Sequence, residues 1–219
     1  FLRTEYLPGA RASTAARDLP DGVAWYRDQV KEFTTTDLTP DAIHQIGLKE
    51  VARIDADLRA AMVQSGFKGE YQDFLVFLRT DPQFYARTPD ELLGFSSYVI
   101  KRMDGKLKDI FTTLPRHRFT LRPVADAIAP TYTSGRGGLD ACYMNTYDLK
   151  SRPLFMLTAL TLHECVPGHS HQGAMALEAP AAPPFRRQTY FSGYGEGWGL
   201  YTEYLGRELG MYRNPYEEF

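Results

Sequence analysis

The sequence contains little cysteine, little net charge and no long apolar run. Only Cys142 and Cys165 occur among its 219 residues, and they are too few for a disulfide scaffold and lack the paired spacing of a cysteine-based zinc site. The 25 lysines and arginines nearly balance the 27 aspartates and glutamates, so no overall basic field is present to hold nucleic acid or an anionic membrane. The longest strongly apolar stretch, residues 153–162, is about half of the roughly 20 residues that a membrane-spanning helix needs. We therefore expect no membrane span and no nucleic-acid partner, and we expect any substrate to be recognised by a local site.

The chain does have the composition of a folded domain. Hydrophobic residues make up 43% of it and charged residues 24%, a mix that is typical of globular proteins and excludes disorder for most of the chain. Its length is enough to bury a sizeable core in one large domain. The chain starts at Phe1 rather than at a methionine, and residues 214–219 read as a turn followed by the start of another helix. We therefore expect a fragment, which would be periplasmic or secreted if its missing N-terminus carried a signal peptide.

Hydrophobic periodicity predicts a mainly helical fold of the α+β class with one small antiparallel sheet. Apolar residues three and four positions apart mark the helices, and short alternating runs between turn residues mark the strands. Thr88, followed by Pro89, is expected to cap one helix. We expect residues 1–20 to form an arm or a loop and residues 21–219 to be part of one helical domain that is truncated at its C-terminal end. The expected helices are 21–33, 40–66, 71–78, 90–111, 152–166 and 195–209, the strands lie within 116–124 and 139–147, and a linker covers 178–184.

Three of the five histidines, His163, His169 and His171, fall within nine residues. A His-Glu pair followed shortly by a second histidine on a buried helix is how many zinc hydrolases supply two imidazole ligands and a base. In the common motif the histidines are four residues apart, whereas His163 and His169 are six apart and would point about 120° apart on a regular helix. Pro167 and Gly168 lie between them and can make the helix bulge, which would swing His169 back towards His163. The string therefore predicts that these two histidines bind one zinc ion.

A catalytic zinc site needs a third protein ligand, which is often a carboxylate from a following helix. Glu196 and Glu203 share a face of the last predicted helix but lie about 10 Å apart along it, so only one of them can touch the ion. The other can orient a ligand from behind. We favour Glu196 as the ligand because it lies among glycines, and a helical glycine costs about 1 kcal/mol unless another backbone approaches closely. Glu164, next to the first ligand, is placed to take a proton from the water that the ion activates.

These strings resemble the bacterial family catalogued as domain of unknown function 885, which is itself similar to helical zinc peptidases of the gluzincin type. The resemblance rests on the pattern His-Glu-x-x-Pro-Gly-His from His163 and on Glu-Gly-Trp-x-Leu-Tyr-x-Glu from Glu196. Similar strings within residues 38–47, 80–85 and 143–147 extend it over residues 20–219.

The resemblance implies a zinc metallopeptidase with a helical core and the small antiparallel sheet beside its active-site cleft. It implies one zinc ion held by His163, His169 and Glu196, with Glu164 as the general base of peptide-bond hydrolysis. It also implies that the strand within 139–147 lies beside the cleft, where in related peptidases such a strand pairs with the substrate backbone. The family often has a histidine directly after the second ligand, where this chain has Ser170 and then His171, so the role of His171 stays open.

Several other side chains have both a functional and a structural interpretation. Tyr194 and Tyr201 could donate a hydrogen bond to a developing oxyanion, but most of the 14 tyrosines must simply pack. Cys165 is expected to be a small buried residue rather than a nucleophile. The glycine-rich stretch 135–138 is expected to be a turn rather than a phosphate loop. We expect Arg116, Arg118 and Arg122 to lie on the solvent face of a strand. The alternative is that one of them binds a carboxylate of the substrate.

The sequence is also compatible with two functions other than that of a peptidase. One is a module that keeps the scaffold and binds metal or peptide without catalysis. The other is a hydrolase of a non-peptide amide or ester, because the same site could perform that reaction. In each case the expected partner is a peptide or a small amide or ester, together with one zinc ion.

Overall fold

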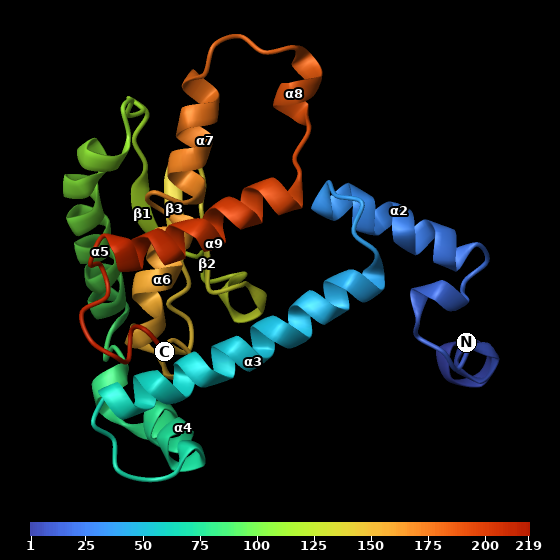
Figure 1. Cartoon of the computed structure of the whole chain (residues 1–219), viewed down its shortest axis with the longest axis horizontal. Helices are drawn as coiled ribbons and strands as arrows, with labels where there is room; N and C mark the ends of the chain where they lie inside the picture. Colours follow the sequence, from blue (N-terminus) through green and yellow to red (C-terminus); the bar gives the residue numbers. More distant parts are fainter. The chain divides into compact units, whose positions relative to one another are not determined.

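A computed structural model describes the backbone of residues 1–219 and every side chain except that of Arg187. The chain is mainly helical and contains one small three-stranded sheet (Figure 1). By its internal contacts it divides into two compact units, one of residues 1–51 with 191–193 and one of residues 52–190 with 194–219. None of the helices in the described part of the chain is both long and apolar enough to cross a membrane.

The first unit consists of short helical turns and two longer helices. Turns at Leu2–Tyr6, Leu7–Gly9 (α1) and Ala16–Asp18 occupy the stretch that was expected to be an arm or a loop. Helix α2, Gly22–Thr34, matches the predicted helix closely. Helix α3, Pro40–Gln64, begins at the predicted proline, ends two residues before Gly66, and continues into the second unit.

The second unit begins with helices whose ends follow the capping rules. Helix α4 spans Tyr71–Thr80 and helix α5 spans Pro89–Ile110. The Thr88 hydroxyl accepts a hydrogen bond from the Glu91 amide at 3.1 Å, which satisfies one of the free amides in the first turn of α5. The predicted cap of this helix is confirmed.

The sheet is mixed, so the prediction of an antiparallel sheet is wrong. Its strands are β1 (Thr120–Pro123), β2 (Gly135–Arg136) and β3 (Ala141–Met144), in the order β1-β3-β2. Strand β3 runs parallel to β1 and antiparallel to β2. The chain between β1 and β3 reverses twice, and the second reversal is a hairpin whose first strand has only two residues. Such a short strand has no alternating pattern that could reveal it in the sequence.

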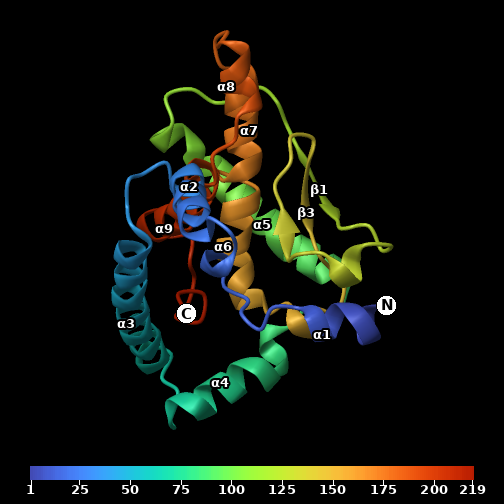
Figure 2. The same cartoon turned by 90° about the vertical axis from the view of Figure 1, so that its right-hand side faces the viewer.

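The predicted helix over residues 152–166 is confirmed, and it is followed by a second helix that was not predicted. Helix α6 spans Leu154–Glu164 and helix α7 spans His169–Glu178. After a short helix α8, Pro184–Gln188, the chain enters α9, Ser192–Glu208. In Figure 2, α6 and α7 follow one another nearly along one line, with the sheet on one side and α9 on the other.

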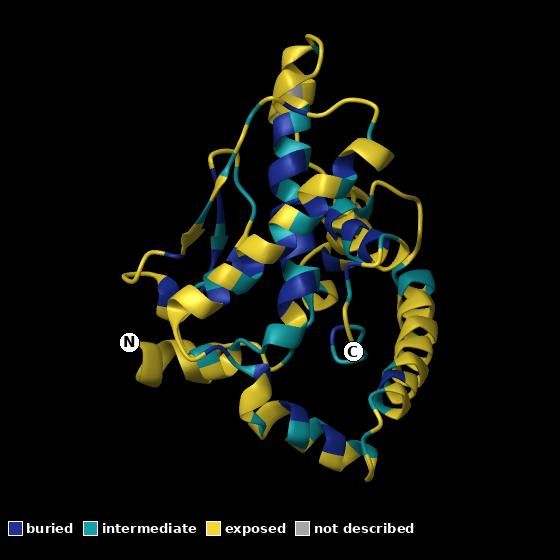
Figure 3. Cartoon of the chain, turned by 90° about the vertical axis from the view of Figure 1, so that its left-hand side faces the viewer, coloured by how far each residue is buried: buried dark blue, intermediate teal, exposed yellow. Residues whose placement is uncertain are grey.

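Helix α6 lies at the centre of the core of the second unit. Its residues Leu157 and Leu162 are buried, each within a separate apolar cluster, and both clusters also contain residues of α5. Figure 3 shows the buried residues gathered along α6 and the facing sides of its neighbours, whereas α3 is almost wholly exposed. The helix that carries the first expected metal ligand is therefore packed into the core of this unit.

A disulfide joins Cys142 of β3 to Cys165 at the end of α6. Both residues are fully buried, as expected for Cys165. The bond was not predicted from the sequence, because 23 residues separate the two cysteines and only the packing of β3 against α6 brings them together. A covalent link therefore fixes the sheet to the residue that directly follows Glu164.

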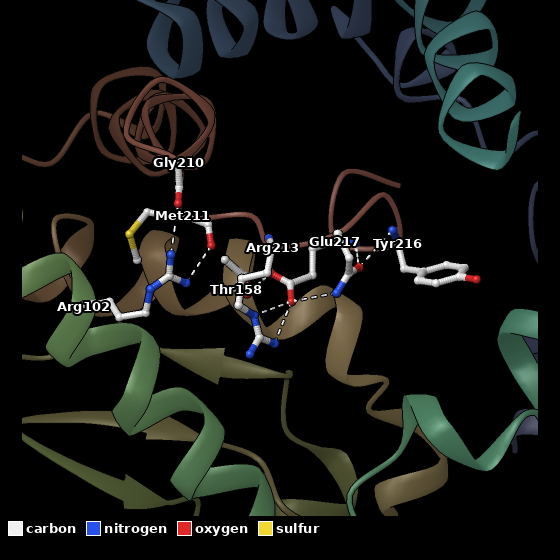
Figure 4. Close-up of polar contacts among 8 residues, drawn as sticks. Arg102, Thr158, Gly210, Met211, Arg213, Tyr216 and Glu217 are labelled. Carbon is white, nitrogen blue, oxygen red and sulfur yellow. Dashed lines mark hydrogen bonds and ion pairs between the residues drawn. The ribbon is translucent and has the colours of Figure 1, made fainter. Parts of the chain in front are cut away.

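The segment after α9 folds back onto α5 and α6 through buried polar contacts (Figure 4). Glu217 is only 6% exposed, and its carboxylate accepts hydrogen bonds from Arg213 at 2.7 Å and from the Thr158 hydroxyl of α6 at 2.8 Å. Arg102 of α5 donates to the carbonyl groups of Gly210 and Met211, each at 2.9 Å. These contacts hold the C-terminal end of α9 against the helices that it packs on.

Candidate metal centre

The break between α6 and α7 brings the two histidines of the motif together. Residues 165–168 separate the helices, and a Cβ atom on Gly168 would lie 1.8 Å from the His163 carbonyl oxygen, so only glycine fits there. The imidazole rings of His163 and His169 have centroids 4.8 Å apart. The predicted bulge within one helix is wrong, because the chain ends one helix and starts another.

Glu196 of α9 completes a group of three possible metal ligands with His163 and His169. Its Oε2 atom lies 3.5 Å from Nε2 of His163 and 3.5 Å from Nε2 of His169. A tetrahedral zinc ion at about 2.0–2.2 Å from its ligands would place neighbouring ligand atoms about 3.4 Å apart. Two imidazole nitrogens and one carboxylate oxygen at this spacing fit a single ion of that size. The Glu196 side chain is 56% exposed, so solvent has access to the group.

Glu203 lies behind His163 rather than beside the three ligand atoms. Its Oε1 atom is 2.7 Å from Nδ1 of His163, so the carboxylate accepts the Nδ1 proton and leaves Nε2 with a free lone pair. This fixes the tautomer and the orientation of the ring, as carboxylates behind metal-binding histidines commonly do. Glu196 therefore lies with the two histidines, and Glu203 lies behind one of them.

Close packing of α9 on α6 sets the distance between the ligands. A Cβ atom on Gly199 would lie 2.5 Å from the His163 ring, whereas one on Gly197 would meet nothing within 4 Å. The Thr202 hydroxyl donates to the Leu162 carbonyl at 3.1 Å, and the Trp198 indole donates to the Pro167 carbonyl at 2.9 Å. The close neighbour expected for the glycines of this helix was another backbone, whereas at Gly199 the neighbour is the side chain of the ligand His163.

The contact with Glu203 also raises the pKa of His163. The hydrogen bond to Glu203 is the largest cause; burial opposes it, and the negative charges of Glu164, Glu203 and Glu196 add to it. A proton on His163 competes with a metal ion for the ring. The ring of the metal-free protein therefore holds its proton to a higher pH than an ordinary histidine does.

We predict that zinc affinity falls on acidification from a higher pH than the ordinary histidine pKa of about 6.5 would give. Because the proton on His163 is bound more tightly, the competition starts while the pH is still above that value. In Glu203→Gln the onset should move to lower pH, since the main cause of the raised pKa is removed. Zinc titrations of both proteins across a pH series measure this, and an onset at the same pH in both would contradict it.

We also predict that Glu203→Gln weakens zinc binding about 10- to 100-fold at neutral pH. Glutamine has nearly the same shape but no charge with which to polarise the ring. Competition with a chromophoric chelator measures the affinity. Glu208→Gln is the matched control, because Glu208 is an exposed residue at the end of the same helix, and its affinity should equal that of the unmodified protein.

The general-base candidate Glu164 is held by the glycine-rich turn between β2 and β3. The Gly137 amide donates to Oε2 of Glu164 at 2.7 Å, and the Gly138 amide donates to the Ser170 hydroxyl at 3.1 Å. A Cβ atom on Gly137 would lie 2.2 Å from the Glu164 carbonyl oxygen and 2.4 Å from the Cβ of His169. Of the stretch 135–138 that was predicted to be a turn, Gly137 and Gly138 belong to the connection between β2 and β3, whereas Gly135 and Arg136 form strand β2. The contact with Glu164 was not predicted. The run of glycines is the one signal that could have indicated a close approach.

Strand β3 lies differently from the strand that the resemblance implied beside a cleft. It is the central strand of the sheet, and Tyr143 and Met144 pair with β1 on one side and with β2 on the other. An extended substrate could not pair with β3 at these two residues. The outer strand on the side of Glu164 is β2, because a Cβ atom on Gly135 would lie 3.2 Å from Cγ of Glu164.

Tyr190, which the sequence analysis did not single out, contacts the third ligand. Its hydroxyl donates to Oε1 of Glu196 at 3.1 Å, while Oε2 points towards the histidines. Burial acts to raise the pKa of Glu196, but the bond from Tyr190 and the nearby rings of His169 and His163 lower it overall. A Cβ atom on Gly195 would lie 2.0 Å from the Tyr190 hydroxyl, so this glycine makes room for the tyrosine.

Tyr194, Tyr201 and His171 lie away from the three ligand atoms. Tyr194 is 70% exposed and Tyr201 48% exposed, and they lie about 160° and 140° around α9 from Glu196. The ring of His171 is buried and packs 4.8 Å from the ring of Phe111. Burial, and then the charge of Arg118, lower the pKa of His171. The structure thus groups His163, His169 and Glu196, with Glu164, Glu203 and Tyr190 around them.

Comparison with known proteins gives one family and a solved structure. A family model described as "Bacterial protein of unknown function (DUF885)" matches residues 1–219. The crystal structure of "the putative lipoprotein from Colwellia psychrerythraea" matches with a TM-score of 0.90 and 31% sequence identity, over 97% of this chain and 39% of that chain. The chain therefore spans well under half of that relative. No curated protein matches it.

Proposed function

We propose that this chain, which belongs to the bacterial DUF885 family, holds the metal centre of a zinc-dependent hydrolase that cleaves peptide bonds. The observation that carries the proposal is the position of Glu196 Oε2, 3.5 Å from Nε2 of His163 and from Nε2 of His169. Glu203 behind His163 and Glu164 beside it add the supporting carboxylate and the base that such a site needs. The resemblance of the motif to gluzincin peptidases favours a peptide as the substrate.

The residues around the ligands have separate tasks in this proposal. Zinc, when bound, would polarise the scissile carbonyl group and lower the pKa of the attacking water. The Gly137 amide occupies Oε2 of Glu164, which leaves Oε1 to take a proton from that water and later deliver it to the departing amine. Glu203 orients His163, and Tyr190 holds the second oxygen of Glu196. The hydrogen bonds to Glu164 and Glu196 thus determine which oxygen of Glu164 transfers the proton and which oxygen of Glu196 binds the metal ion.

We further propose that the protein functions in the bacterial cell envelope or outside the cell. One relative of known structure is described as a "putative lipoprotein", and a buried disulfide between Cys142 and Cys165 is stable in an oxidising compartment. Alkylation of thiols in acid-quenched cells, read by mass spectrometry of the protein, tests this location. Recovery of both cysteines as free thiols would contradict it.

The experiment that tests the enzymatic proposal compares metal-free and zinc-loaded protein on a mixture of peptides. Products are identified by mass spectrometry after treatment with a chelator and after zinc is added back. Hydrolysis that disappears with the chelator and returns with zinc is expected. A protein that binds no zinc would overturn the proposal, whereas zinc binding without cleavage of any peptide would favour a binding module. Cleavage only of small amides or esters would identify a non-peptide hydrolase.

A further inference from the structure

A cavity of about 320 Å³ lies between α5, the segment that leads into β1, and the start of α7. We call it the side cavity. Figure 1 shows these three elements next to one another. Apolar side chains form much of its wall, namely Ile100, Leu107, Pro115, Phe119, Val166 and Ala174. Its volume is at the lower end of the range of about 300–1,000 Å³ that is usual for small-molecule sites.

The side cavity is separate from the metal centre. It is lined by Ser170, His171 and Ala174 of α7 but not by His169, the ligand on that helix. Successive residues of an α-helix are about 100° apart, so His171 and Ala174 point roughly opposite to His169. Helix α7 therefore presents one face to the metal ligands and the other to this cavity.

Arg118 is the unpaired charge of the side cavity. Among the described residues it has no hydrogen bond and no ion pair, although its charge acts on the neighbouring ring of His171. The other charged groups of the lining have partners: Lys101 pairs with Asp104 at 2.7 Å, and Nε2 of His117 lies 3.2 Å from the carboxylate of Asp140. The cavity thus has one positive charge available for a ligand.

His171 provides a second unsatisfied polar group in the same lining. The residue is only 4% exposed, and its Nε2 atom is buried without a hydrogen-bond partner in the part of the chain that the structure describes. Buried polar atoms are nearly always paired, and an unpaired one commonly marks a missing ligand or water. A free guanidinium and a residue with an unpaired imidazole nitrogen, both in the lining of one cavity with apolar walls, are suited to a small acid.

We propose that the side cavity binds a small organic acid with an apolar body. Its carboxylate pairs with the guanidinium of Arg118 and shares a hydrogen bond with the ring of His171. Its apolar part lies against Ile100, Leu107 and Phe119. A guanidinium and a carboxylate form charge-assisted hydrogen bonds, which are stronger than bonds between neutral groups. The site is independent of the zinc ion, so it stands whether or not the protein is a hydrolase.

The test measures binding of phenylacetate by isothermal titration calorimetry. The protein is first freed of metal with a chelator, so that the acid cannot bind to zinc. The alcohol 2-phenylethanol and the amine 2-phenylethylamine serve as probes with the same ring and another head group. We expect phenylacetate to bind at millimolar concentration or below, and the other two to bind at least about 10-fold more weakly.

Two arginine variants decide whether Arg118 makes the contact. Arg118→Gln should weaken phenylacetate binding about 10-fold or more, and the residue is exposed, so the substitution should not disturb folding. Arg122→Gln is the matched control, because Arg122 is an exposed residue of the adjoining strand outside the cavity lining. Equal affinity for acid and alcohol, an equal loss in both variants, or no binding of phenylacetate to the unmodified protein would each overturn the proposal.

Discussion

Replacing Glu164 by glutamine should leave zinc binding intact and slow peptide hydrolysis by about 10²- to 10⁴-fold. Glutamine keeps the shape of the side chain and an oxygen that can still accept the Gly137 amide, which donates to Glu164 at 2.7 Å. It removes only the ability to take up and return a proton. Because Glu164 is not one of the three grouped ligand residues, the affinity for the ion should change little.

Two measurements on the same preparation distinguish this outcome from damage to the site. Elemental analysis gives the zinc content, and kcat/KM with a cleavable fluorogenic peptide gives the catalytic effect. Glu178→Gln is a suitable control: Glu178 is exposed, at the far end of α7, and accepts hydrogen bonds from the amides of Arg116 and His117. Unchanged hydrolysis in Glu164→Gln would remove Glu164 as the base, and loss of zinc would reassign it to a structural role.

Local rules predicted most helices because those helices begin and end where local chemistry dictates. Thr88 and Pro89 mark the start of α5, and a proline starts α3, since a capping hydroxyl and the fixed backbone angle of proline act within one turn. The same rules failed at α7, which starts at His169 without a side-chain cap. The break before it depends on the close passage of Gly168 over the His163 carbonyl, a contact formed only in the folded chain.

In the candidate metal centre, too, some residues could be predicted from the sequence and others could not. The motif itself identifies His163 and His169, and helical geometry separates Glu196 from Glu203, because residues seven apart on a helix cannot both reach one ion. The contacts that hold the site come from elsewhere in the fold. Gly137 reaches Glu164 across 27 residues of sequence and Tyr190 reaches Glu196 from the segment before α9. The run of glycines indicates a close approach at Gly137 but not its partner, and no local pattern marks Tyr190.

The disulfide is the clearest example of a contact that the sequence does not reveal. Its removal is expected to have a large effect on the stability of the protein. Replacing both Cys142 and Cys165 by alanine should lower the free energy of unfolding by about 3 kcal/mol. A bond that closes a loop of this length restricts the unfolded chain, and the two cysteines are 23 residues apart. Both are fully buried, so the smaller alanine side chains also leave space in the core.

Loss of the disulfide should also weaken the metal centre, because Cys165 directly follows Glu164 and β3 is the second strand of the hairpin that contains Gly137. Without the covalent link, the packing of β3 on α6 alone must hold that hairpin over Glu164 and His169. We therefore expect weaker zinc binding in the double variant, together with a lower midpoint in urea. A reducing agent should destabilise the unmodified protein and leave the double variant unchanged, since only the former has a bond to lose. If the reductant destabilised both proteins equally, the expected role of the disulfide would be contradicted. If both proteins were equally stable in the absence of reductant, packing alone would position the sheet against Glu164.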